Sequence, residues 1–214
     1  MQSYSRRHAV KLLAAASLIP LATPAVAETP FSIVALGDSL TAGYGLPPED
    51  AFTTRLEQRL KAKGLNVEVV NAGVSGDTSK AGLSRIDWSV PDGTGLVIVE
   101  LGANDALRGI SPVQTEKNLD GIIARLKERD IPVLLTGMLA PPNMGKDYEA
   151  AFNAIYPKLA EKHGVELYPF FLDGVVADPK LNQADGIHPN AAGTAVIVER
   201  LSPTVDKLVR LLTS

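Results

Sequence analysis

The chain of 214 residues carries 21 Lys and Arg against 24 Asp and Glu, so its formal net charge is −3 and no nucleic-acid partner is expected. It contains no cysteine, which excludes a disulfide, a thiolate zinc site, a cysteine nucleophile and a lipoprotein anchor. Stability must therefore come from a hydrophobic core, and the length suits a single domain.

The first 27 residues have the pattern of an export signal. A basic segment precedes an apolar stretch over residues 12–21, and Ala25-Val26-Ala27 matches a small-residue cleavage site. The stretch is shorter than the roughly 20 residues that span a bilayer, so no stable membrane anchor is expected. We predict a signal peptide at 1–27, a mature domain at 28–214 and a periplasmic or secreted protein. The arginine pair near the start leaves both the general secretory and the twin-arginine export routes open.

Short apolar runs rich in β-branched residues predict buried strands at 31–36, 67–70, 96–101, 133–136 and 165–168. Segments with helical spacing alternate with them, at 51–63, 79–88, 112–129, 148–163 and 191–212. Gly64 and Gly164 fit helix ends, Ser111-Pro112 fits a helix start, and Pro203 predicts a break in the last helix. This alternation predicts an α/β fold, a three-layer α/β/α sandwich around a five-stranded parallel sheet.

The loops that follow the strands carry the polar chemistry. Ser39 lies directly after the first strand, Gly73 follows the second, and Asn104 follows the third. The carboxyl ends of parallel strands meet at one edge of the sheet, where such folds bind ligands. A serine hydroxyl needs a base to become a nucleophile, and acyl transfer also needs donors for the developing oxyanion. Ser39, Gly73 and Asn104 are candidates for the hydroxyl and the donors.

The mature chain offers two histidines as the base. His163 precedes Gly164 at a helix end, where the helix dipole favours a cation, so we expect a structural role. His188 lies in Asp185-Gly186-Ile187-His188-Pro189 and is the candidate base. A turn at Gly186 would fold the Asp185 carboxylate back under the imidazole.

Four sequence blocks resemble those of the SGNH hydrolases, also called GDSL esterases. The blocks are Gly37-Asp38-Ser39-Leu40, Gly73, Gly102-Ala103-Asn104-Asp105 and Asp185-Gly186-Ile187-His188. Within that family the chain is similar to a bacterial periplasmic group of acyl-CoA thioesterases, lysophospholipases and arylesterases, through Ser75-Gly76-Asp77-Thr78-Ser79, Leu107-Arg108-Gly109 and residues 155–160. The resemblance implies a flavodoxin-like SGNH hydrolase fold.

The resemblance also implies the role of each residue. Ser39 would be the nucleophile, His188 the base and later acid, and Asp185 the group that orients His188. The oxyanion donors would be the amides of Ser39 and Gly73 and the side chain of Asn104. No cofactor or metal is implied, and the expected substrates are small esters, thioesters or lysophospholipids, with nothing in the chain that demands more than a monomer.

Several other polar residues have simpler interpretations. Asp38 is expected to support its loop, and Asp77 and Asp105 are expected to be caps or turn residues. The apolar loop at 138–145 follows the fourth strand on the same edge of the sheet, and we expect it to wall an acyl or aromatic pocket through Met144, together with Leu107.

Two other classes of protein compete with a serine esterase. A metal-dependent phosphoesterase also uses GD- and GN-type loops on an α/β scaffold, but it needs more histidines than the mature chain holds. A periplasmic binding protein would hold an ester without cleaving it, but binding alone does not require a serine, a base and oxyanion donors together.

Overall fold

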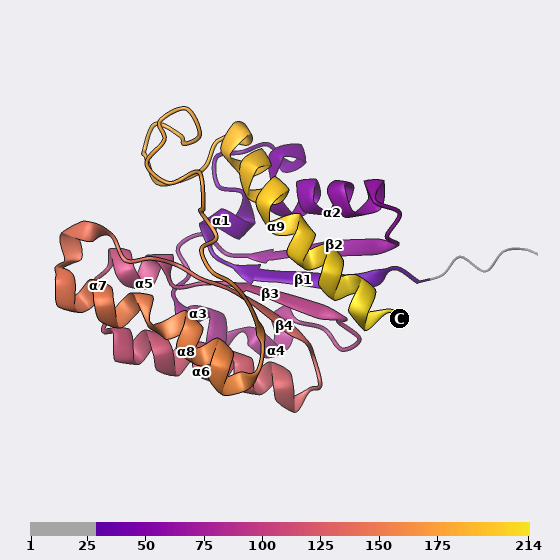
Figure 1. Cartoon of the computed structure of the whole chain (residues 1–214), viewed down its shortest axis with the longest axis horizontal. Coiled ribbons are helices and arrows are strands. Elements are labelled where there is room, and N and C mark those ends of the chain that lie inside the picture. The colour runs from indigo at the N-terminus through magenta and orange to yellow at the C-terminus, as the bar shows by residue number, and fades with distance from the viewer. Residues whose placement is uncertain (1–28) are drawn as a thin grey trace, which may run out of the picture.

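The computed structural model describes residues 29–214, so the predicted signal peptide lies outside the described residues. A five-stranded, all-parallel sheet forms the centre, in the order β2-β1-β3-β4-β5 (Figure 1). Its strands are β1 (Phe31–Gly37), β2 (Val67–Gly73), β3 (Leu96–Glu100), β4 (Val133–Thr136) and β5 (Glu166–Tyr168). The α/β class and the five predicted strands are confirmed, with small shifts at some strand ends.

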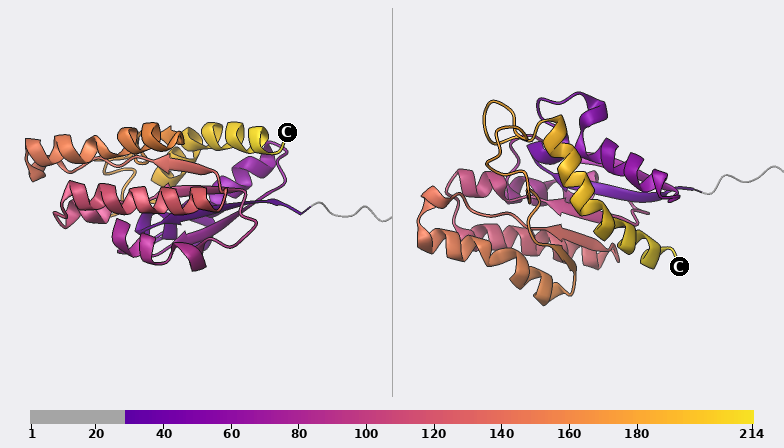
Figure 2. Two further views of the ribbon diagram at one scale, coloured as in Figure 1. Left: turned by 90° about the horizontal axis from the view of Figure 1, so that it is seen from below. Right: turned by 45° about the horizontal axis from the view of Figure 1, so that its top comes forward.

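Helices connect the strands and cover the sheet (Figure 2). The longer ones are α2 (Phe52–Ala62), α6 (Pro112–Glu128), α7 (Lys146–Asn153), α8 (Ile155–His163) and α9 (Ala191–Leu212). The shorter ones are α1 (Ser39–Ala42), α3 (Ser79–Ser84), α4 (Ile86–Ser89), α5 (Ala103–Leu107) and the 3-10 turns η1 (Pro48–Asp50) and η2 (Pro142–Met144).

The helices form two groups. Helix α2 packs against α9, whereas α3 packs against α6 and α6 against α8. The chain moves from β1 to β2 in one direction along the sheet and then from β3 to β5 in the other. Right-handed crossovers therefore place the two groups on opposite faces. The central strands β1, β3 and β4 are buried between them.

Two predicted helices are interrupted in the structure. The segment at 148–163 divides into α7 and α8 around Ala154, because Pro157 has no N–H to donate to the Asn153 carbonyl. The segment at 79–88 divides into α3 and α4 at Arg85, whose buried guanidinium reaches inward to the Gly37 carbonyl.

The predicted break near Pro203 is wrong, because α9 runs unbroken from Ala191 to Leu212. Pro203 lies on the exposed side of the helix. Leu201 and Val205 on either side of it are fully buried, and this packing holds the helix together across the missing hydrogen bond. The predicted helix ends are confirmed at Gly64, Gly164 and Ser111.

Candidate active site

The end of β1 places Ser39 at the carboxyl edge of the sheet. The Asp38 side chain caps α1, with Oδ1 accepting from the Leu40 N–H at 3.0 Å, and Ser39 is the first residue of that helix. The Thr41 hydroxyl donates to Glu100 Oε2 at 2.7 Å, and this bond joins α1 to the last residue of β3. A Cβ at Gly37 would lie 2.0 Å from the Thr41 hydroxyl oxygen, so this turn requires glycine.

The loop before α9 brings Asp185 and His188 together. Gly186 has φ +70°, and this turn folds the Asp185 carboxylate back toward the chain that follows it. Asp185 Oδ1 accepts from the Ile187 and His188 amides at 2.9 and 3.0 Å, and Oδ2 lies 2.7 Å from His188 Nδ1. These hydrogen bonds, above all those from His188, lower the Asp185 pKa to about 2.

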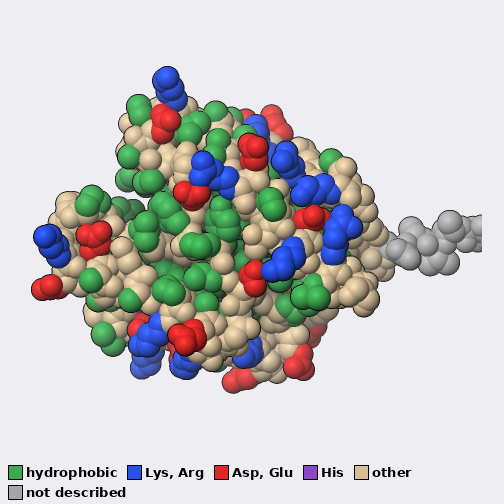
Figure 3. All heavy atoms as spheres, in the orientation of Figure 1, with side chains coloured by type: hydrophobic (Ala, Val, Ile, Leu, Met, Phe, Trp, Pro, Cys, Tyr) green, Lys and Arg blue, Asp and Glu red, His purple; other side chains and the backbone are tan. Residues whose placement is uncertain are grey.

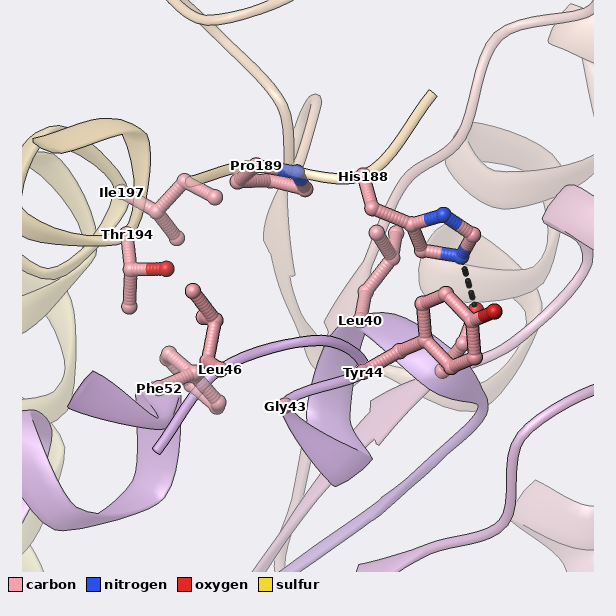
Figure 4. A pocket seen from close by; sticks show the side chains of 10 residues that line it. Leu40, Gly43, Tyr44, Leu46, Phe52, His188, Pro189, Thr194 and Ile197 are labelled. Atoms are coloured by element: carbon pink, nitrogen blue, oxygen red, sulfur yellow. Dashed lines mark hydrogen bonds between the residues drawn. The ribbon is translucent and has the colours of Figure 1, made fainter. Parts of the chain in front are cut away.

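His188 also reaches Ser39. Its Nε2 lies 2.9 Å from Ser39 Oγ, the bond drawn as a dashed line in Figure 4. With its proton on Nδ1, donated to Asp185, the imidazole presents Nε2 as an acceptor for the serine hydroxyl. The Tyr44 ring lies beside the imidazole, with ring centroids 4.6 Å apart and planes tilted by 38° (Figure 4). The structure thus brings together the three residues that the sequence named as a triad.

Two of the three expected oxyanion donors have an N–H group that is not engaged within the described residues. The Asn104 amide lies in α5 and donates one N–H to Asp38 Oδ2 at 3.0 Å, which leaves its second N–H for another acceptor. The Ser39 N–H belongs to the first turn of α1, where amides have no partner within the helix.

The third expected donor, Gly73, is already engaged. Gly73 ends β2 opposite Gly37, and its N–H donates to Asn71 Oδ1 at 2.9 Å. Asn71 in turn donates to the Thr41 carbonyl at 3.0 Å. Gly76 follows three residues later with φ +87°, and its N–H has no hydrogen-bond partner among the described residues.

Two buried carboxyl groups lie beneath the serine. Asp38 and Glu100 are both fully buried, and the Asp38 N–H donates to Glu100 Oε2 at 3.3 Å. Burial raises the Asp38 pKa to about 6. Burial, with a further contribution from the nearby Asp38 charge, raises the Glu100 pKa well above its usual value. Glu100 Oε1 has no hydrogen-bond partner among the described residues.

The other polar residues named from the sequence have structural partners. Asp77 pairs with buried Arg85 at 2.6 Å. Asp105 is buried and accepts from the Ser79 N–H at 2.7 Å. His163 Nε2 lies 2.6 Å from Asp120 Oδ1 at the end of α8, and His163 lines a hollow with Leu96 and Val133, the first residues of β3 and β4, at the edge of the sheet opposite Ser39.

Sequence reasoning missed Glu100 and Tyr44. A signal for Glu100 was present, because it is the one charged residue in the otherwise apolar run at 96–101. Tyr44 gave no comparable signal, since its contact with His188 joins loops that are far apart in the chain.

An apolar pocket of about 480 Å³ opens beside the triad. Ala103, next to Asn104, and Ile187, next to His188, both line it. Leu107 also lines it, as the sequence predicted. Met144 does not line it but lies by a separate hollow at the start of α7, so the two residues expected to share one pocket lie by different ones. A second, much smaller cavity of about 10 Å³ is lined by Ser39, His188 and the residues labelled in Figure 4.

The described residues contain no group of three or more His, Asp and Glu side chains arranged to hold a metal ion.

Comparisons with known proteins agree with this geometry. The chain is 40% identical over 187 residues to an arylesterase of Vibrio mimicus, covering 86% of this chain and 92% of the relative. It is 40% identical over 179 residues to thioesterase 1/protease 1/lysophospholipase L1 of Escherichia coli K12, covering 83% and 85%. The crystal structure of AlinE4, an SGNH-hydrolase family esterase, superposes with a TM-score of 0.71 at 49% identity, covering 83% and 96%. The model of the GDSL-like lipase/acylhydrolase family matches residues 35–196, and the chain belongs to that family.

Proposed function

We propose that this protein hydrolyses carboxylic esters through an acyl-enzyme formed on Ser39. The observation that carries the proposal is the chain of contacts from Ser39 Oγ to His188 at 2.9 Å and from His188 to Asp185 at 2.7 Å. The names of the relatives support aryl esters, acyl thioesters and lysophospholipids as the range of substrates.

In this mechanism His188 moves the protons. Nε2 takes the hydroxyl proton as Ser39 Oγ attacks the ester carbon, and the imidazolium then gives that proton to the leaving alcohol or thiol. Water deacylates the enzyme with the same base. Asp185 holds the imidazole in the required tautomer, and its low pKa keeps it ionised throughout the working pH range.

The negative oxygen of the tetrahedral intermediate needs preorganised donors. We assign this task to the Ser39 amide and to the free N–H of Asn104. Gly73 would serve as the third donor only if its bond to Asn71 opened.

The function is tested with 4-nitrophenyl esters of acyl chains from two to twelve carbons, with wild-type protein and Ser39→Ala, in the presence and absence of a chelator. We expect the chelator to leave turnover unchanged. The Ser39→Ala substitution should lower turnover by at least about 10⁴-fold. Turnover that survives the serine substitution would contradict the mechanism. Loss with the chelator would favour the metal-dependent phosphoesterase, and the absence of any turnover would favour a binding protein.

The pocket has its own test. Leu107→Ser places a hydroxyl in the apolar pocket and should lower kcat/KM for long chains more than for acetate, by about tenfold. Met144→Ser is the matched control, because Met144 lies outside the pocket, and its chain-length profile should match that of the wild type. If the wild type, Leu107→Ser and Met144→Ser had the same chain-length profile, this pocket would not be the site that binds the acyl chain.

We also propose that the protein is exported as a monomer after cleavage of residues 1–27. No helix among the described residues has the length and apolar character needed to cross a membrane. The intact mass of the protein recovered from the periplasm or medium should correspond to a chain that begins at Glu28, and light scattering should give the mass of one chain. A full-length chain that stays in the membrane fraction would contradict cleavage.

A further inference from the structure

Most of the surface of the pocket beside the triad is apolar. Its wall comes from the loop after β4, from α5 and α7, and from the loop before α9. Figure 3 shows apolar side chains gathered around a hollow on the side of the molecule where Figure 1 places α7. Such a wall suits the hydrocarbon part of an acyl group.

One charged side chain interrupts this wall. Glu149 on α7 is the only charged residue that lines the pocket. Its carboxylate forms no ion pair and no hydrogen bond with any other described residue. Its helix neighbour Asp147, by contrast, is exposed and lines the separate hollow at the start of α7.

An unpaired carboxylate in an apolar wall has a consequence for the ligand. Glu149 lies in the first turn of α7, where the helix amides favour a negative charge, but no ion pair neutralises its carboxylate. A positive group on the ligand is therefore attracted and a negative one is repelled. Asn153, one turn further along α7, also lines the pocket, but its Oδ1 already accepts from the Ala140 N–H at 2.9 Å. The Nδ2 group of Asn153, which is its donor, makes no hydrogen bond to the Glu149 carboxylate, so Asn153 does not offset that charge.

Resting on the proposed ester hydrolysis, we propose that Glu149 is a specificity-determining residue that favours acyl groups with a positively charged far end. An acyl chain attached to Ser39 would lie along the apolar wall between Ala103 and Ile187, and its far end would approach α7. A neutral chain would still bind through the wall. An acyl group that ends in a carboxylate would meet the charge of Glu149 and bind poorly.

The test uses three 4-nitrophenyl esters of equal chain length, which differ only at the far end. The acyl groups are hexanoate, 6-(trimethylammonio)hexanoate and the half-ester of adipate. The quaternary ammonium cannot cyclise onto the ester. The kcat/KM of each substrate is measured, after subtraction of the rate without enzyme, for wild type, Glu149→Gln and Asp147→Asn. The last variant removes an equal charge from the same helix outside the pocket.

We expect the ratio of kcat/KM for the cationic over the anionic ester to fall by about tenfold in Glu149→Gln and to stay near the wild-type value in Asp147→Asn. Added salt should lower the ratio in the wild type. Unchanged hydrolysis of hexanoate by Glu149→Gln would show that the fold and the active site are intact. An equal ratio in wild type and Glu149→Gln would overturn the inference. Absence of hexanoate hydrolysis in the wild type would instead overturn the proposed function.

Discussion

Ser39 and His188 lie 149 residues apart in the chain, and two very different parts of the molecule hold them. Ser39 sits on buried structure: β1 beneath it is largely inaccessible to solvent, and Asp38, Thr41 and Glu100 are fully buried around it. His188 lies in an irregular loop between β5 and α9, where the Asp185 side chain remains 37% exposed. The nucleophile is positioned by the core and the base by local turns.

The loop that carries His188 is held in place by short-range hydrogen bonds rather than by burial. The Gln183 N–H donates to the His188 carbonyl at 2.7 Å, and Asn182 and Pro189 form an isolated bridge. Gln183 Nε2 also donates to the Tyr44 carbonyl at 2.7 Å and so links this loop to the nucleophile side. Substitutions near Ser39 should therefore affect both stability and activity, whereas those near His188 should affect activity with little loss of stability.

The largest separation of activity from stability is expected at His188. His188→Ala removes the base and should lower kcat by about 10⁵-fold. Because local turns hold the loop, the Tm should change by only about 2 °C. Steady-state kinetics and thermal unfolding on the same preparation measure both. A large fall in Tm would contradict the view that local bonds hold this loop.

Asn104→Ala should have the next largest effect. It removes an oxyanion donor at a cost of about 3 kcal/mol in transition-state stabilisation, or roughly 10²-fold in kcat, with little change in KM. It also removes a hydrogen bond that lowers the pKa of buried Asp38, so the protein should lose stability as well. A change confined to KM would contradict the assignment of Asn104 to the oxyanion.

The buried carboxyl beneath the serine predicts how stability depends on pH. The folded-state pKa of Glu100 is raised, so its contribution to stability is complete below the unfolded value of 4.5 and is lost as the pH rises through the folded pKa. Glu100→Gln has no carboxyl group to ionise at this position, so the variant does not lose this stability as the pH rises. Denaturant unfolding from pH 5 to pH 9 should therefore show the variant gaining stability relative to wild type, by a difference of order 1 kcal/mol. If the free energy of unfolding changed with pH in the same way in both proteins, the raised pKa of Glu100 would be contradicted.

The smallest expected effect is at Tyr44, where the two parts of the site meet. Its ring lies against the imidazole that becomes charged during the reaction, so Tyr44→Leu should lower kcat by about fivefold. Tyr44→Phe keeps the ring and should retain wild-type kcat. Equal losses in both variants would assign the effect to the hydroxyl and rule out a role for the ring.

The same contrast explains how much the sequence could predict. Five β-branched runs predicted five strands, because a parallel sheet buried on both faces selects such runs. Ser39 and Asn104 became candidates because they follow strand ends that share one edge, whereas His188 became the candidate base because His163 had a structural interpretation. The Asp185–His188 contact was accessible from the sequence, since it spans three residues and turns at Gly186.

Features that depend on distant contacts were not predictable. The effect of Pro203 was misjudged because buried neighbours hold α9 together. The engagement of the Gly73 amide depends on a side-chain orientation at Asn71, which no pattern encodes. Met144 was expected at the pocket because its apolar loop follows the fourth strand, but its side chain lines a separate hollow at the start of α7.

The central claim is that Ser39, activated by His188, forms the covalent intermediate. Treatment with a 4-nitrophenyl alkylphosphonate, followed by peptide mass spectrometry, tests it most directly. We expect one adduct, on the peptide that contains Ser39, formed much more slowly in His188→Ala and absent in Ser39→Ala. An adduct on another residue, or none in a protein that still hydrolyses esters, would contradict the account.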